Sequence, residues 1–220
     1  MNLDDKNDKR IALLVKINGQ DNLDDNLFLE DKLVKLTNET QAEAGLFIYD
    51  SYKILNKSDD INFDFAVHEI WDCNESYAKH INNKHTADFL ALQYKNIITN
   101  IEFSIWDIMI DYNLKNRKKN ECKILLECII NSDYSTIFGD SLSFFIDNLT
   151  NEKSCLNYGC FKKDINKKQN DDYRFCMIVG FEDIQSQEMI QSQDYFSNFI
   201  NIINLITQKS LIESKMVAIT

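Results

Sequence analysis

Glu69, Trp71, His80 and His85 follow one another in the segment EIWDCNESYAKHINNKHTADF, and their types and spacing could support proton chemistry. Glu69 and Trp71 are two residues apart in an apolar run, so a strand there turns both side chains to the same face. A carboxyl held among apolar groups has a raised pKa, and an imidazole exchanges protons near neutral pH. These residues therefore predict a pocket that moves protons or polarises a carbonyl.

Each residue also has a structural interpretation. Trp71 could be a core residue, and Glu69 could pair with a lysine such as Lys79. His85 follows a break in the predicted helix, where a side chain can point into a pocket, and His80 precedes that break. Both interpretations stay open for Glu69, Trp71 and the two histidines.

Three further residues are candidates for binding a substrate in the same pocket. Tyr49 and Trp106 offer aromatic rings, and Asn18 is a polar residue at the end of the first predicted strand. Packing is the alternative role for the two rings, and exposure to solvent is the alternative for Asn18.

Metal and nucleotide sites have weak support in the sequence. His80 and His85 are five residues apart, so one helix does not present both on one face, and no third His or Cys stands at zinc-ligand spacing. The sequence has no G-x-G-x-x-G or P-loop motif. We therefore expect no metal site and no cofactor.

Apolar alternation and helical periodicity predict the elements that position these residues. In the N-terminal half we expect strands at 11–17, 46–54, 63–71 and 101–109, and helices at 26–43, 75–81 and 84–99. In the C-terminal half we expect strands at 122–130, 154–161, 173–181 and 211–219, and helices at 141–149 and 184–208. The order β-α-β-β-α-β in each half is that of a ferredoxin-like fold.

The two halves can be aligned by hand. Tyr49 aligns with Tyr158 at an offset of 109 residues, and Trp71 aligns with Phe181 at an offset of 110. A ferredoxin-like half leaves one sheet face bare, and a second copy would cover it. The predicted class is therefore α+β, with two tandem ferredoxin-like halves forming an intramolecular pseudo-dimeric α/β barrel.

The predicted domains are residues 10–112 and 122–220, with a polar linker at 113–121. Because the tandem chain carries its own partner, we expect a monomeric pseudo-dimer or a homodimer. In the C-terminal half Val179 stands in place of the acid, Ile190 in place of the first histidine and Tyr195 in place of the second. That half is therefore expected to be degenerate as a site.

Composition narrows the classes of partner and compartment. The net charge of −11 argues against nucleic acid and against an anionic membrane surface. The six cysteines form no CxxC pair, and the charged start MNLDDKNDKR lacks the apolar region of a secretory signal. We expect a cytoplasmic protein that binds neither nucleic acid nor membrane.

Three segments resemble the antibiotic biosynthesis monooxygenase family: ETQAEAGLFIYD (39–50), FAVHEIWDCNESYAKH (65–80) and NNKHTADFLA (82–91). The resemblance covers most of residues 10–110 and is fainter in the C-terminal half. Thr86 departs from the pattern, because the family often has an aromatic residue there. The resemblance implies a dimeric α/β barrel, with His85, His80 and Glu69 handling protons and Trp71 as a wall.

The resemblance favours a cofactor-free monooxygenase that acts on a phenolic or quinol-type substrate. Deprotonation of such a substrate gives an electron-rich anion that reacts with oxygen directly, inside apolar walls that exclude water. Two alternatives stay open: a non-catalytic module that binds or senses a small apolar or aromatic molecule, and a haem protein with His85 as the axial ligand.

Overall fold

The computed structural model describes residues 9–56, 61, 63–114, 121–164, 172–207 and 211–219. The described residues divide into two compact units. The N-terminal unit contains residues 9–107 and 216–219, and the C-terminal unit contains residues 108–215. Helices and antiparallel strands occur in both units, which confirms the α+β class. Most of the predicted linker, residues 115–120, lies outside the described residues.

The sheet of the N-terminal unit is antiparallel, with the strand order β4–β1–β3–β2. Its strands are β1 (Ile11–Gly19), β2 (Leu46–Ile54), β3 (Phe65–Trp71) and β4 (Ile98–Tyr112). The last residues of β8 (Ile212–Ala218) pair with the end of β2, through Tyr52 and Ala218 among others. Residues 108–112 of β4 and 212–215 of β8 belong to the C-terminal unit.

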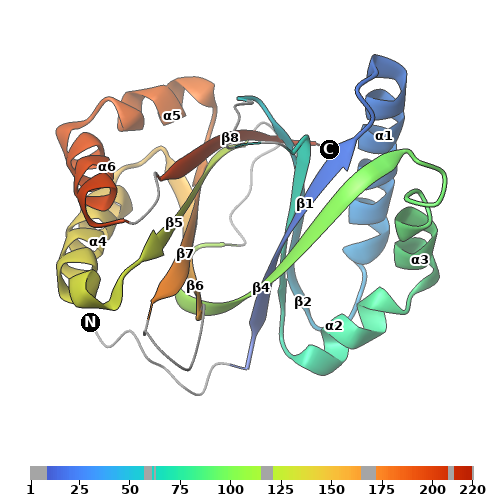
Figure 1. Cartoon of the computed structure of the whole chain (residues 1–220), viewed down its shortest axis with the longest axis horizontal. Coiled ribbons are helices and arrows are strands. Elements are labelled where there is room, and N and C mark those ends of the chain that lie inside the picture. The colour runs from blue at the N-terminus through green and yellow to red at the C-terminus, as the bar shows by residue number, and fades with distance from the viewer. Residues whose placement is uncertain are drawn as a thin grey trace. The chain divides into compact units, whose positions relative to one another are not determined.

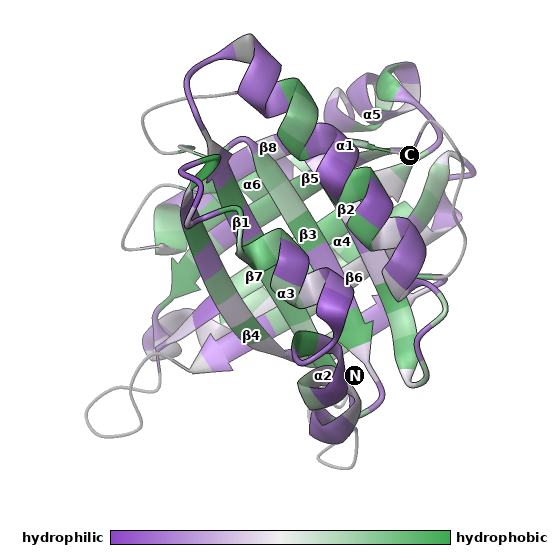
Figure 2. Ribbon diagram, turned by 90° about the vertical axis from the view of Figure 1, so that its right-hand side faces the viewer, coloured by the Kyte–Doolittle hydropathy of each residue, from purple (hydrophilic) through white to green (hydrophobic). Residues whose placement is uncertain are grey.

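Three helices cover one face of this sheet: α1 (Leu23–Thr40), α2 (Asn74–Ile81) and α3 (Lys84–Leu90) (Figure 1). The core between helices and sheet contains Leu13, Leu33, Phe65, Val67 and Trp71, among others. Figure 2 shows largely hydrophilic turns of α2 and α3 over hydrophobic strands. Burial of this apolar surface is the main force that holds the helices on the sheet.

Helix α1 is shifted toward the N-terminus relative to the predicted 26–43. The side chain of Asn22 accepts a hydrogen bond from the backbone N–H of Asp25 at 2.8 Å and so caps the first turn. The helix ends at Thr40, and residues 41–45 form turns before β2 begins. The early end of α1 leaves Glu43 outside the helix, a placement that matters for the site described below.

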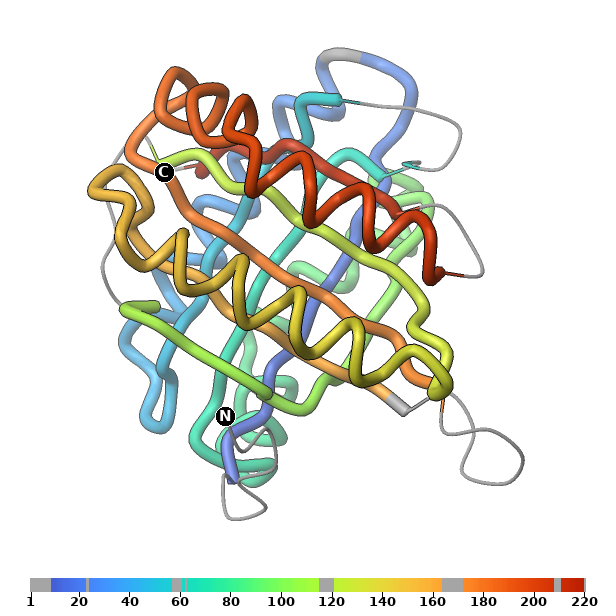
Figure 3. The backbone as a smooth tube through the Cα atoms, turned by 90° about the vertical axis from the view of Figure 1, so that its left-hand side faces the viewer, coloured from blue at the N-terminus to red at the C-terminus, as the bar shows by residue number. Residues whose placement is uncertain are grey.

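The C-terminal unit has a matching set of elements. Strands β5 (Cys122–Ile130), β7 (Tyr173–Phe181) and β6 (Cys155–Asp164) pair antiparallel, in that order. The helices are α4 (Ser135–Asn151), α5 (Ile184–Gln191) and α6 (Asp194–Ile206). Helices α4 and α6 lie side by side over the strands (Figure 3), and the rings of Phe145 and Phe199 stack between them at 4.2 Å.

One predicted helix of this unit is divided in the structure. The expected helix 184–208 is two helices, α5 and α6, separated at Ser192–Gln193. The N-terminal unit has the same break between α2 and α3, at Asn82–Asn83. No helix among the described residues is both long enough and apolar enough to cross a membrane.

Candidate active site

A tight turn between α1 and β2 brings Glu43 to the site. Gly45 in this turn has a φ of 85°, a left-handed conformation that favours glycine. A Cβ at Gly45 would lie 2.2 Å from Ser76 Oγ and 2.6 Å from Asp72 Oδ1. The Gly45 carbonyl also accepts a hydrogen bond from the N–H of Asp72 at 2.8 Å. The turn is therefore held against the start of α2, with Glu43 beneath the two helices.

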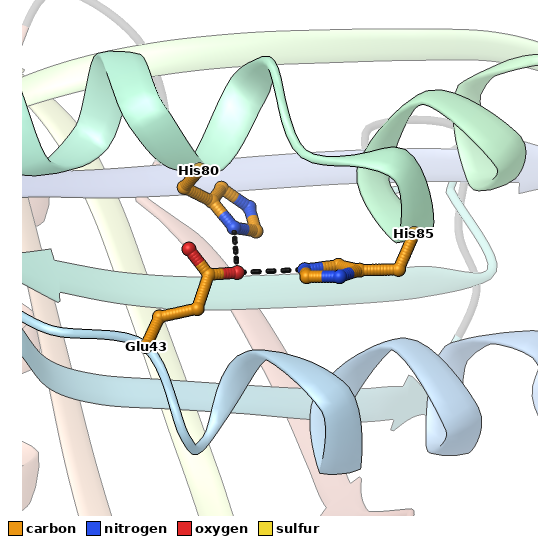
Figure 4. Close-up of side chains that lie close together, drawn as sticks. All are labelled: Glu43, His80 and His85. Carbon is orange, nitrogen blue, oxygen red and sulfur yellow. Dashed lines mark hydrogen bonds and ion pairs between the residues drawn. The ribbon is translucent and has the colours of Figure 1, made fainter.

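The break between α2 and α3 brings the two histidines to the same carboxylate oxygen (Figure 4). His80 lies near the end of α2, and its Nδ1 is 2.9 Å from Glu43 Oε1. His85 lies in the first turn of α3, and its Nε2 is 2.6 Å from the same oxygen. The break at Asn82–Asn83 places the two histidines on separate helices, so their spacing of five residues does not keep them apart.

Burial and hydrogen bonding set the charges of this trio. Burial tends to raise the pKa of Glu43, but the hydrogen bonds and charge of its partners, with His80 first among them, lower it overall. Burial lowers the pKa of His80, and the contact with Glu43 opposes that effect only in part. At neutral pH we therefore expect Glu43 to be ionised and His80 to be neutral.

Glu69 and Trp71 interact directly on β3. The indole Nε1–H of Trp71 donates a hydrogen bond to Glu69 Oε2 at 2.9 Å. Burial raises the pKa of Glu69 to about 7, although the Trp71 hydrogen bond acts in the opposite direction. A carboxyl with this pKa can both accept and release a proton at neutral pH, which is what general acid–base catalysis requires.

Glu69 and His80 line one small cavity, under α2 and α3. Its volume is ≈ 30 Å³, which is room for about two water molecules. Tyr49 and Tyr77 add phenol rings, and burial raises the pKa of Tyr77 to about 12. The remaining wall is apolar apart from Thr86; it is formed by Val15, Ile17, Leu36, Val67, Ile81, Phe89, Leu90, Ile101 and Phe103.

Among the residues that line the cavity, Phe103 is the exposed one, with 48% of its surface accessible. His85 does not line the cavity; it lines a separate open groove between α1 and α3, together with Lys35 and Lys84. Glu43 therefore connects a histidine on the cavity with a histidine on the groove.

The structure brings some of the sequence candidates together and leaves others apart. Glu69, His80 and Tyr49 line the cavity; Trp71 lies beside them, with its ring centroid 4.8 Å from that of His80. Trp106 does not line the cavity. The cavity residues of β4 are Ile101 and Phe103, and alternation along the strand puts Trp106, which pairs with Ala12, on the opposite face. Asn18, whose carbonyl accepts from Thr99, does not line it either.

Glu43 is not among the residues predicted for the site. Its segment ETQAEAGLFIYD supported the family resemblance, but the residue itself was placed inside the preceding helix. A glycine two residues later was the one available signal, because a left-handed glycine ends a helix and turns the chain.

Solved structures share this fold across almost the whole chain. One is a proposed monooxygenase from Lactobacillus acidophilus, with a TM-score of 0.72, 14% identity and coverage of 96% of this chain and 95% of that one. Another is a proposed monooxygenase from Fusobacterium nucleatum, with a TM-score of 0.76, 13% identity and coverage of 97% and 94%. A third is an anthrone oxidase-like protein, with a TM-score of 0.63, 10% identity and coverage of 97% and 93%.

No protein-family model matches the sequence, and no curated protein matches it. Identities this low show a common fold and carry no further detail. The chain therefore has a monooxygenase-like fold, of the kind found in these three structures.

Proposed function

We propose that the chain is a small-molecule monooxygenase that acts without a cofactor on a phenolic or quinol-type substrate, in the cavity of its N-terminal unit. One observation carries the proposal: Glu69, with a pKa of about 7, lines an apolar cavity together with His80. A base of that pKa takes a proton from a phenol more readily than an ordinary carboxylate does. The apolar wall keeps water from the resulting anion.

The proposed reaction begins with transfer of the substrate hydroxyl proton to the Glu69 carboxylate. His80 lines the cavity beside Glu69, and its Nδ1 is held by Glu43 Oε1, which also contacts His85 Nε2. Dioxygen, as co-substrate, then accepts electrons from the anion. For a substrate with a CH2 group conjugated to the phenol, the balanced reaction turns that CH2 into C=O; one oxygen atom of O2 enters the product, and the other leaves as water with the two CH2 hydrogens. Glu69 returns its proton to the product.

An aromatic substrate needs more room than the cavity offers. A volume of ≈ 30 Å³ is far below the roughly 300 Å³ of common small-molecule pockets. We propose that α2 and α3 move apart at Asn82–Asn83 and that substrate enters past Phe103. The exposed ring of Phe103 would give an aromatic substrate its first contact.

We also propose that the two units are tandem ferredoxin-like halves of a pseudo-dimeric barrel, with domains at 10–112 and 122–220. The strand orders β4–β1–β3–β2 and β8–β5–β7–β6 support this, because each places the fourth strand beside the first. Both units also have a register shift near the start of the second strand. The linker at 113–121 is a proposal that limited proteolysis can test, with first cuts expected there.

Oxygen uptake tests the proposed activity directly. Wild type should consume oxygen with members of a panel of quinols, phenols and anthrone-type compounds, and Glu69→Gln should lose that uptake. Glu127→Gln is a matched control, because Glu127 is also a buried carboxyl but lies on β5 in the C-terminal unit. Uptake that survives in Glu69→Gln would remove Glu69 from the mechanism.

A non-catalytic binding module is the alternative. Wild type would then consume no oxygen with any member of the panel, while a bound ring would still quench the fluorescence of Trp71. A haem protein would instead show a Soret band after haem is added.

A further inference from the structure

Glu43, His80 and His85 form a cluster whose donor atoms could bind one ion. Glu43 Oε1, His80 Nδ1 and His85 Nε2 all lie within 4.8 Å of one another. They come from three elements: the turn after α1, the end of α2 and the start of α3. The side chain of His80 is 3% exposed, that of Glu43 12% and that of His85 20%. The cluster is thus shielded but can be reached from the groove.

The donor set selects the class of ion. Two imidazole nitrogens and one carboxylate oxygen suit Zn²⁺, Co²⁺ and Ni²⁺, whereas Mg²⁺ and Ca²⁺ prefer oxygen ligands throughout. Ligands at about 2.0–2.2 Å from a tetrahedral ion are roughly 3.3 Å from each other. The present spacings of Glu43 Oε1 to the two histidine nitrogens, 2.9 and 2.6 Å, need only a small outward rotation of side chains to reach that value.

The surroundings of His80 fit a ligand role as well. A metal-bound imidazole coordinates through one nitrogen and usually donates the N–H of the other. If His80 coordinates through Nδ1, its Nε2–H needs an acceptor; Thr86 Oγ1 lies 3.5 Å from that nitrogen and 3.4 Å from Nδ1, so a small rotation of the ring or hydroxyl is needed to align it. Thr86 is buried and fixed in the first turn of α3. A candidate acceptor for the second nitrogen is thus in contact with the ring.

We propose that Glu43, His80 and His85 bind one divalent ion of the Zn²⁺ class. Three protein ligands leave at least one coordination position for water, on the pattern of open zinc sites. The ion would tie the turn after α1 to both helices that cover the cavity. The ion would also occupy His80 Nδ1, the atom that now contacts Glu43. If the proposed oxygenase activity holds, the bound ion should therefore slow it.

Metal content and spectroscopy test this binding without any enzyme assay. The full chain without a histidine tag would be stripped with chelator, titrated with Co²⁺ and then with Zn²⁺. We expect about one ion per chain, visible absorption bands typical of tetrahedral Co²⁺, and a higher Tm with Zn²⁺. Glu43→Gln and His85→Gln should each weaken ion binding at least about tenfold, because even residues that only hydrogen-bond to metal ligands cost about that much affinity when replaced.

The chain offers a matched control, because it has three histidines and only His68 stands outside the cluster. His68→Gln should keep the Co²⁺ bands, and Glu39→Gln, at an exposed carboxyl of the groove, should keep them too. Absence of stoichiometric binding, or binding that persists in both Glu43→Gln and His85→Gln, would overturn the proposal. Ion binding is measured without oxygen uptake, so the metal site and the oxygenase activity can each be disproved independently of the other.

Discussion

The indole of Trp71 donates a hydrogen bond to the carboxylate of Glu69, two residues earlier on the same face of β3. The bond ties the most strongly perturbed carboxyl of the cavity to a fully buried ring. It favours the ionised form of Glu69 and so partly offsets the effect of burial.

Trp71→Phe should raise the pKa of Glu69 above its present value of about 7, because the substitution removes the hydrogen bond that lowers it. The acid limb of the pH profile for oxygen uptake should then move to higher pH. Trp106→Phe is the matched control: Trp106 is the other tryptophan, is also buried, and does not line the cavity. An acid limb that stays in place in Trp71→Phe would contradict this reading.

Glu69 should make the fold less stable as the pH rises. Its pKa is about 7 in the folded chain and 4.5 for an ordinary glutamate, so the folded state binds this proton more tightly. The resulting contribution is fully present below pH 4.5 and is lost as the pH rises through 7; the gap corresponds to about 3 kcal/mol. Glu69→Gln stays neutral and should escape this loss.

The measurement is urea unfolding of wild type and Glu69→Gln at several pH values. The difference in unfolding free energy between them should change by about 3 kcal/mol in favour of the variant, from acid pH to pH 8. Comparing the two proteins at each pH cancels the effect of groups such as Glu43, whose pKa moves the other way. Parallel pH profiles would show that Glu69 titrates normally.

Gly45→Ala should destabilise the chain and displace Glu43. A φ of 85° costs a residue with a Cβ about 1–2 kcal/mol, and the new Cβ would also meet Ser76 Oγ. Gly139→Ala is the matched control, because Gly139 lies inside α4 with nothing within 4 Å of a new Cβ, so it should stabilise by about 0.5–1 kcal/mol. Chemical unfolding of both variants distinguishes these opposite signs.

Phe103→Ala should widen the mouth of the cavity. Bulky phenols should then enter more readily. Small phenols lose their first contact with the Phe103 ring, so their KM should rise while their kcat changes little. Ile105→Ala is the control: Ile105 is 50% exposed, against 48% for Phe103, and does not line the cavity. Steady-state oxygen uptake with small and bulky substrates gives both constants, and equal effects of the two substitutions would argue against entry past Phe103.

Local patterns in the sequence predicted most of the strands. The strands at 46–54, 122–130 and 173–181 have the predicted bounds, because their runs are rich in apolar, β-branched and aromatic residues. The helix predicted at 84–99 ends instead at Leu90. Asn96 takes a φ of 56°, and the N–H groups of Ile97 and Ile98 both turn back to the carbonyl of Leu92. Periodicity does not reveal such a turn.

The sequence predicted Glu69, His80 and Tyr49 for one pocket, and all three line the cavity, but it did not predict the cluster around Glu43. Alternation placed Glu69 and Trp71 on one face, and the structure joins them by a hydrogen bond. The contacts of Glu43 with His80 and His85 span 37 and 42 residues of chain. No local pattern encodes contacts at that separation, because they depend on where the turn at Gly45 meets the break between two helices.

The helix break of the C-terminal unit has a practical consequence. Glu152 stands 109 residues after Glu43, which is also the offset between Tyr49 and Tyr158. Burial raises the pKa of Tyr195, and the nearby Glu152 raises it further. Ile190 and Tyr195 flank the break at Ser192–Gln193 as the histidines flank theirs. The acid is therefore already in place, and two substitutions, Ile190→His and Tyr195→His, should graft a second histidine–carboxylate cluster into the same molecule.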